Sequence, residues 1–165
     1  MIDNNTIFWA KVKPDAKIPT KRDEDGWYDI YACFEEDYIE IPPHSTKLIP
    51  TGIASAVSPK WKISLGERGT NIKSCSILQA GKIDSGYRGE WFVGIYNGNN
   101  RPLIISKDVD EVVKTILEIK VPYSKAICQA EITEVPKLTH VEVSYDELLT
   151  FKSERGKGAL GSSGK

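Results

Sequence analysis

The stretch GKIDSGYRGE, residues 81–90, carries more information than any other part of the chain. One acid, Asp84, lies in a glycine-rich turn, and apolar runs flank the segment at 76–78 and 91–93. Because two short apolar runs around a glycine-rich turn are typical of a β-hairpin, we expect a hairpin whose tip exposes main-chain N–H and C=O groups to a ligand. An isolated Asp-Ser-Gly turn can also be an ordinary solvated loop.

The rest of the chain consists of short apolar runs separated by proline and glycine turns. Many short strands with few helix-like periods favour an antiparallel barrel or jelly roll, so we predict an all-β fold. Strands are expected over residues 6–13, 28–34, 38–41, 47–57 (broken at Pro50 and Gly52), 61–65, 75–78, 90–96, 101–106, 127–135 and 141–143.

Composition limits the classes of partner. The 165 residues suit one domain, and the formal net charge of −1 offers no attraction for nucleic acid or an anionic membrane, so we expect neither as a partner.

The three cysteines are expected to be buried free thiols. Cys33, Cys75 and Cys128 lack metal-ligand spacing and lie beside apolar residues. With no visible signal peptide and no apolar run of about 20 residues, a cytoplasmic location is expected.

The motifs of the chain, taken together and in order, resemble those of the trimeric dUTP diphosphatases (dUTPases), as in a divergent bacterial or phage-like member. GKIDSGYRGE is similar to the third motif of that family. The other four are found at 11–32, 66–70, 127–129 and 155–164. Ordered motifs over nearly the whole chain are a much stronger signal than one short pattern.

The resemblance implies a jelly-roll domain over residues 1–152 and a flexible glycine-rich arm over 153–165 that closes over the phosphates. It also implies hydrolysis of dUTP to dUMP and diphosphate with Mg²⁺, in a homotrimer whose active sites each combine residues of three subunits. Residues 107–118 form an insertion relative to the family. Its apolar spacing suits a short helix or an extra hairpin arm, and it is either a surface elaboration or a contact for a regulatory protein partner.

The resemblance also assigns roles to individual residues. Asp84 is the expected catalytic base that orients and deprotonates the attacking water. Uracil and deoxyribose would be contacted by Gly81, Ile83, Tyr87 and Leu160. The phosphates would be bound by Arg68, Gly69, Thr70, Gln129, Arg155, Gly161, Ser162 and Ser163. Asp29 would hold a water of the Mg²⁺ ion, or else cap the turn after Gly26.

Each role has a plainer alternative. Arg68 could form only a surface ion pair with Glu67, and Gln129 could be an unengaged polar residue on an exposed strand face.

Three positions depart from the family pattern. Gly69 stands where the family has a serine that hydrogen-bonds the phosphates, with Thr70 next. Residues 124–126 read Ser-Lys-Ala instead of Gly-acid-Arg, and Leu160 replaces the aromatic that stacks on uracil. Trp91, beside the hairpin, is a candidate replacement for that aromatic.

These departures keep a second reading open, in which the protein senses nucleotide or binds a partner and turns over slowly. A dCTP deaminase of the same fold is less favoured, because it would need a glutamate base near the pyrimidine.

Overall fold

The computed structural model describes residues 2–79 and 81–154. Its contacts divide the chain into two compact units, one ending at Val135 and the other beginning at Pro136. We had expected the β domain to extend to residue 152, whereas the compact unit ends at Val135. The two units are described separately.

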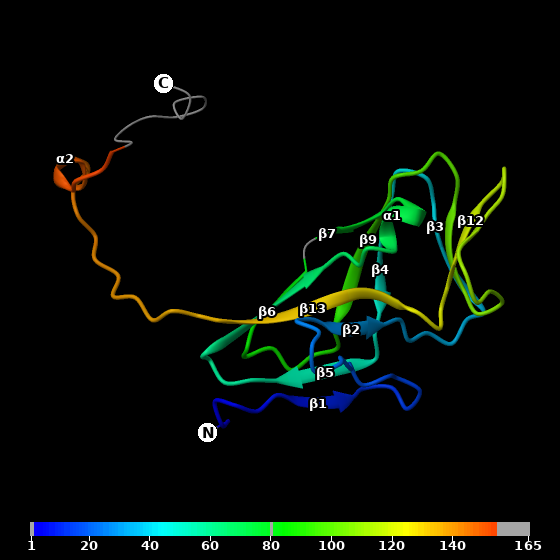
Figure 1. The fold of residues 1–165 in the computed structure, drawn as a ribbon, viewed down its shortest axis with the longest axis horizontal. Coiled ribbons are helices and arrows are strands. Elements are labelled where there is room, and N and C mark those ends of the chain that lie inside the picture. Colours follow the sequence, from blue (N-terminus) through cyan, green and yellow to red (C-terminus); the bar gives the residue numbers. More distant parts are fainter. Residues whose placement is uncertain (1, 80, 155–165) are drawn as a thin grey trace. The chain divides into compact units, whose positions relative to one another are not determined.

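The first unit is built from strands, which confirms the predicted all-β class (Figure 1). Its strands are β1 (Phe8–Lys11), β2 (Tyr28–Tyr31), β3 (Tyr38–Ile41), β4 (Thr46–Pro50), β5 (Ile53–Ala56), β6 (Trp61–Gly66), β7 (Ser76–Gln79), β8 (Lys82–Ile83), β9 (Phe92–Asn97), β10 (Leu103–Ser106), β11 (Val113–Lys114), β12 (Ile119–Pro122) and β13 (Ala126–Glu134). A four-residue helix, α1 (Asn71–Ser74), precedes β7.

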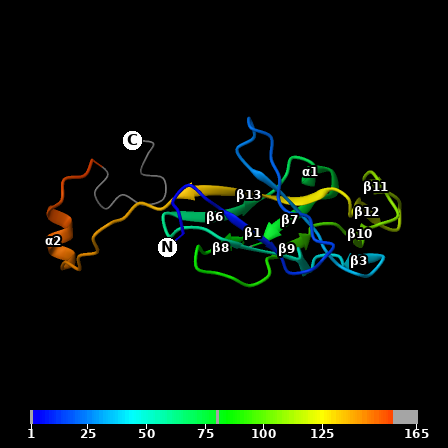
Figure 2. The ribbon, with the colours of Figure 1, turned by 90° about the horizontal axis from the view of Figure 1, so that it is seen from below.

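The strands form four small sheets, in the orders β1–β5, β11–β12–β10–β3, β2–β13–β6–β8 and β4–β9–β7. All pairs are antiparallel except β10 with β12. β13 lies between β2 and β6 (Figure 1) and runs beside β6 in the view of Figure 2; it is the longest strand among the described residues. Side chains from all four sheets meet in one apolar core that includes Ile30, Ile41, Ile49, Ile53, Ile63, Trp91, Val93, Leu103, Ile105 and Ile119.

The expected hairpin around residues 81–90 is present with one modification. β7 and β9 pair antiparallel, as the flanking apolar runs predicted. The segment that joins them, however, contributes β8 to the neighbouring sheet, where Ile83 pairs with Ile63 of β6. Gly81 has φ of +100°, and a Cβ there would lie 2.9 Å from the Cβ of Leu65, so both conformation and space require glycine.

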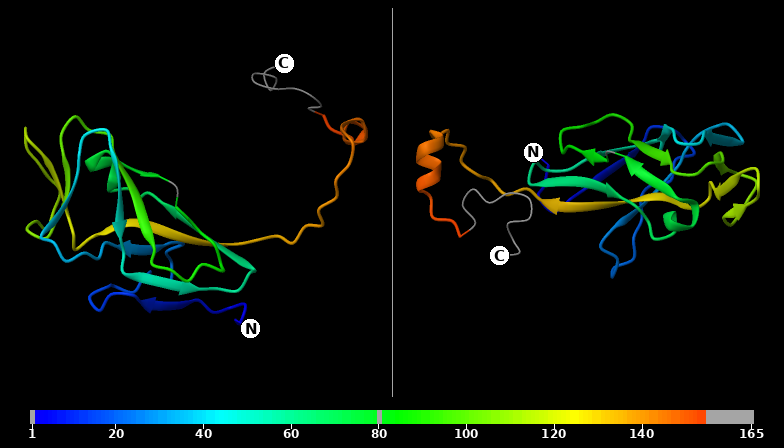
Figure 3. Two further views of the ribbon diagram at one scale, coloured as in Figure 1. Left: turned by 180° about the vertical axis from the view of Figure 1, so that it is seen from behind. Right: turned by 90° about the horizontal axis from the view of Figure 1, so that it is seen from above.

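The inserted segment 107–118 is an arm and not a helix. β11 pairs antiparallel with β12, and a turn from Thr115 to Glu118 joins them. The arm projects from the unit in both views of Figure 3, where it is yellow-green. Two side chains at the turn, Ile116 and Leu117, are 90% and 75% exposed. The turn therefore presents apolar surface outward.

The second unit contains a helix that we had not predicted. Residues 141–143, expected as a strand, are not a strand; they lead into α2 (Tyr145–Thr150). The hydroxyl of Ser144 accepts a hydrogen bond from the N–H of Glu147, which is half of a capping box. The Ser-x-x-Glu spacing of Ser144 and Glu147 is the signal in the sequence for the start of this helix.

Two expectations about core residues are wrong. Cys33 and Cys128 are buried free thiols as predicted, and burial raises the pKa of Cys128 to about 12, but Cys75 is exposed. Trp91 is fully buried and packs edge-on against Trp9 with ring centroids 5.2 Å apart. Its ring belongs to the core and is not available to stack on a base.

Among the described residues, no helix is long and apolar enough to cross a membrane.

Candidate functional site

Three predicted site residues from distant parts of the chain meet on the β2–β13–β6 sheet. The register sets Gln129 of β13 opposite Asp29 of β2 and Gly66 of β6. The amide of Gln129 donates to Asp29 Oδ1 over 3.1 Å, and Arg68 Nε lies 3.4 Å from the same oxygen. Asp29 therefore holds an arginine and an amide side by side.

Arg68 does not form the surface ion pair that was its plainer alternative. Its Nη1 donates to the carbonyl oxygen of Ala126 over 2.9 Å, while Glu67 accepts a hydrogen bond from the N–H of Leu78. Within the described chain, no partner is recorded for Arg68 Nη2. A guanidinium that is oriented by two contacts and keeps a free nitrogen is suited to bind an anionic oxygen.

Asp29, Arg68 and Gln129 line one wall of a pocket of about 620 Å³. The other lining residues were not predicted as site residues and come from the segment before β2: Thr20, Lys21, Arg22, Glu24, Asp25, Gly26 and Trp27. Trp27 packs over Gly66, where a Cβ would lie 2.9 Å from its ring. Proximity in sequence to Asp29 was the available signal for these residues.

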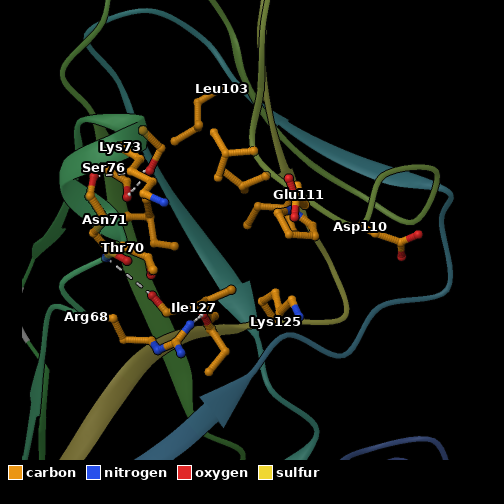
Figure 4. A pocket seen from close by; sticks show the side chains of 17 residues that line it. Arg68, Thr70, Asn71, Lys73, Ser76, Leu103, Asp110, Glu111, Lys125 and Ile127 are labelled. Carbon is orange, nitrogen blue, oxygen red and sulfur yellow. Dashed lines mark hydrogen bonds between the residues drawn. The ribbon is translucent and has the colours of Figure 1, made fainter.

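Gly69 and Thr70 follow Arg68 on the exposed approach to α1. A Cβ on Gly69 would meet no atom within 4 Å. Thr70 and Arg68 also line a second pocket of about 440 Å³ below α1, together with Lys73 and Lys125 (Figure 4). Arg68 thus borders both cavities, and there is space around Gly69 for a larger side chain.

Asp84 and Tyr87 lie at the exposed tip of the 81–90 segment. The N–H of Tyr87 donates to the carbonyl of Asp84 over 3.0 Å, and its hydroxyl donates to the carbonyl of Glu90 over 2.9 Å. A Cβ on Gly89 would collide with the Tyr87 ring, so glycine is needed there for the ring to fold back. Gly81 and Ile83, also predicted to contact the substrate, begin the same segment; Ile83 is buried.

The chain does not bring Asp84 and Arg68 together. Ile83 pairs with Ile63 near the middle of β6, whereas Arg68 lies beyond the other end of that strand, after Gly66. Gly66 lies three positions after Ile63 on β6, which corresponds to about 10 Å along the strand. The tip and the Asp29–Arg68–Gln129 cluster are therefore two separate parts. Arg155, Leu160, Gly161, Ser162 and Ser163 lie outside the described residues.

No group of three or more metal-ligating side chains occurs among the residues that the structure describes. The carboxylate of Asp29 uses Oδ1 for Arg68 and Gln129, and no contact to its Oδ2 is recorded in the described chain. That side chain is 30% exposed and borders the pocket. It can accept a hydrogen bond from a metal-bound water, which fits a hydrated cation better than a dehydrated one.

The fold and these two parts define an all-β protein with a polar pocket beside the Asp29–Arg68–Gln129 cluster and a separate exposed tip at Asp84 and Tyr87. No family model matches the chain. Among curated proteins, the chain is 32% identical to a deoxyuridine 5'-triphosphate nucleotidohydrolase of Clostridioides difficile, with 93% of this chain and 94% of the relative covered. It is 31% identical to that of Candida albicans, with 92% and 84% covered. The chain belongs to the dUTPase family.

Solved structures show the same fold. The dUTPase of Staphylococcus bacteriophage 80alpha with dUPNHPP, described as controlling transfer of virulence genes by a G protein-like mechanism, matches with a TM-score of 0.72 at 23% identity over 98% of this chain and 99% of that one. A mutant dUTPase of phage phi11 of S. aureus, which coordinates a structural Mg(II) ion, matches with a TM-score of 0.64 at 20% identity over 84% and 98%.

The open space at Gly69 leads to a prediction. Gly69→Ser restores the hydroxyl that the family places beside the phosphates, and it fits without a clash. A hydrogen bond to a charged group contributes about 1.5–3 kcal/mol, so we expect kcat/KM for dUTP to rise on the order of tenfold. Steady-state diphosphate release measures this, with Gly69→Ala as the matched control that adds only the methyl group. Equal rates for the two variants would contradict the prediction.

Proposed function

We propose that the protein hydrolyses dUTP to dUMP and diphosphate. The observation that carries this proposal is the convergence of Asp29, Arg68 and Gln129 on one pocket, because these residues come from three family motifs distant in sequence. A guanidinium and an amide donor held side by side suit the oxygens of a phosphate chain. Membership of the dUTPase family supports dUTP as the nucleotide.

In the proposed reaction, Asp84 holds a water in line with the α-phosphorus and accepts its proton. The water oxygen bonds to the α-phosphorus while the bond to the bridging oxygen breaks, and diphosphate leaves with the electron pair. Asp84 is exposed and carries no recorded side-chain partner among the described residues. A carboxylate is a weak base near neutral pH, so its contribution comes mainly from positioning the water.

The nucleoside would be read at the tip. Main-chain groups between Gly81 and Tyr87 would bind uracil, with too little room for the methyl of thymine and the wrong donor pattern for cytosine. The Tyr87 ring, folded back against Gly89, offers a flat face for deoxyribose where a ribose 2′-hydroxyl would clash. Arg155, Ser162 and Ser163, with Gly161 and Leu160, would close the site from the C-terminal arm.

Mg²⁺ would neutralise phosphate charge and orient the phosphate oxygens when bound. Asp29 is the residue of this chain that would hold one of its waters, through the carboxylate oxygen that Arg68 and Gln129 leave unused. Such a cation is held largely by substrate and water, which agrees with the absence of an acid cluster from the described residues.

A homotrimer would complete the site. The pairing of Ile83 with Ile63 lies about 10 Å along β6 from Gly66, and β8 runs antiparallel to β6, so the chain continues from Ile83 to Asp84 in the direction away from Arg68. A neighbouring copy could bring its tip to this pocket, with the arm of a third copy closing it.

The catalytic assignment is tested with Asp84→Asn. This variant keeps the shape and removes the base, so we expect turnover to fall by about 10²–10⁴-fold while dUTP still binds. Diphosphate release from dUTP, dCTP, dTTP and UTP, with Mg²⁺ and with EDTA, measures turnover, and calorimetry measures binding. Asp37→Asn, an exposed acid at the start of β3, serves as the control. Loss of dUTP binding in Asp84→Asn would contradict the assignment.

A second function, contact with a regulatory protein partner, is supported by the arm. Ile116 and Leu117 are largely exposed at a turn that Thr115 stabilises, since its hydroxyl accepts the N–H groups of Leu117 and Glu118. Two apolar side chains on an ordered turn can act as a preformed anchor. The phage 80alpha relative, described as regulatory, gives a precedent.

The exposed side chains of Ile116 and Leu117 are expected to serve partner binding and not catalysis. Replacing Ile116 and Leu117 by serine should abolish partner capture and leave dUTP turnover within about twofold of wild type, because loss of a central apolar anchor costs about 2 kcal/mol or more in binding alone. Pull-down from host extract with wild-type and variant protein, identified by mass spectrometry, measures it. Val135→Ser, another exposed apolar residue, is the control. Equal capture by all three proteins would contradict the arm as the contact.

A further inference from the structure

The tip of the 81–90 segment is fixed very differently at its base and at its end. At the base, the N–H of Trp91 donates to Ile53 over 2.9 Å, and Glu90 Oε1 accepts the N–H of Gly52 over 2.8 Å. These bonds attach the base firmly to the chain around β5. Beyond it, from Asp84 to Tyr87, one main-chain hydrogen bond is recorded within the described chain, from the N–H of Tyr87 to the carbonyl of Asp84.

The Tyr87 hydroxyl donates to the carbonyl of Glu90, and the side chain of Arg88 supplies further contacts at the end of the tip. Its Nη1 donates to the carbonyl of Ser85 over 2.7 Å and to that of Tyr87 over 2.8 Å, with a longer contact of 3.5 Å to Ser55 on β5. The first two are short, charge-assisted hydrogen bonds. A single guanidinium nitrogen thus ties both sides of the turn that carries Asp84 and Tyr87.

Apart from Arg88, the turn is held by the hydrogen bond from the Tyr87 hydroxyl to the carbonyl of Glu90 and by the Tyr87 ring, which lies over Gly89. A Cβ on Gly86 would meet nothing within 4 Å, and Tyr87 is 44% exposed. Lys82, the other cation of the segment, has no recorded side-chain hydrogen bond among the described residues, so it does not duplicate Arg88. Without the guanidinium, the carbonyls of Ser85 and Tyr87 would turn to water and the turn would lose its fixed form.

We propose that Arg88 is a positioning residue that holds the Asp84–Tyr87 turn and thereby sets the preference for dUTP over UTP. The inference rests on the proposed function, in which Tyr87 meets the sugar and Asp84 the water. In that proposal, Arg88 contacts neither the sugar nor the attacking water. Arg88 fixes the position of Tyr87 relative to Asp84. Its loss therefore weakens both the rejection of the ribose 2′-hydroxyl and the turnover of dUTP.

The test compares kcat/KM for dUTP and for UTP in wild type, Arg88→Met, Arg88→Lys and Lys82→Met, with melting temperatures recorded in parallel. Arg88→Met removes both charge-assisted hydrogen bonds of the turn, so the dUTP to UTP ratio of kcat/KM should fall on the order of tenfold. Arg88→Lys, which keeps a cationic donor, should recover part of the ratio. Lys82→Met, the matched loss of charge on the same segment, should keep the wild-type ratio.

The outcomes separate this inference from the proposed function. An unchanged ratio in Arg88→Met, or an equal fall in Lys82→Met, would overturn the role of Arg88 while wild-type turnover upholds the diphosphatase. A lower melting temperature with an unchanged ratio would make Arg88 purely structural. If wild type releases no diphosphate, the proposed function fails, and the ratio of dUTP to UTP dissociation constants in the same four proteins decides the role of Arg88. Should Arg88→Met not fold, Arg88→Lys alone supplies the comparison.

Discussion

The antiparallel pairing of β6 with two partners is the constraint on which the candidate site depends. On one side β13 brings Gln129 next to Gly66, and on the other side β8 fixes Ile83 against Ile63. Ile63 and Ile83 are both buried, and each such side chain contributes about 1.5–3 kcal/mol to stability. Because β6 continues into Arg68, one strand sets the place of the Asp29–Arg68–Gln129 cluster and of the 81–90 tip.

Asp29 is the common acceptor of the Asp29–Arg68–Gln129 cluster. Its carboxylate orients both the guanidinium of Arg68 and the amide of Gln129, and both side chains of the ion pair are only partly exposed. Removing the acid would leave two donors without their acceptor, which is more costly than the pair itself is stabilising. Asp29 therefore has a structural effect that does not depend on any role at Mg²⁺: it holds the donor groups of Arg68 and Gln129 in place.

The short strands and the 81–90 hairpin could be predicted from the sequence because apolar runs and glycine turns are local signals. Pairing partners could not: nothing near Ile83 indicates that β8 joins β6, since that contact spans about twenty residues and depends on the whole sheet. Similarly, Lys21 and Trp27 enter the phosphate pocket through folding of a loop without periodicity. The burial of Trp91 is set by packing in the core, and the contacts of Arg88 with its own turn are set by the direction of its side chain. Neither can be deduced from the neighbouring residues in the sequence.

In the proposed homotrimer, each active site needs Asp84 from one copy and Arg68 from another. Co-expression of Asp84→Asn with Arg68→Ala, followed by measurement of dUTP turnover by the purified mixture, tests whether two copies share one active site. Each variant should be inactive when expressed alone. In a trimer assembled at random from equal amounts, about a quarter of the sites would combine an intact Asp84 with an intact Arg68, so about a quarter of wild-type activity should return. A mixture that forms mixed trimers yet stays inactive would place both residues in the same copy and contradict the account.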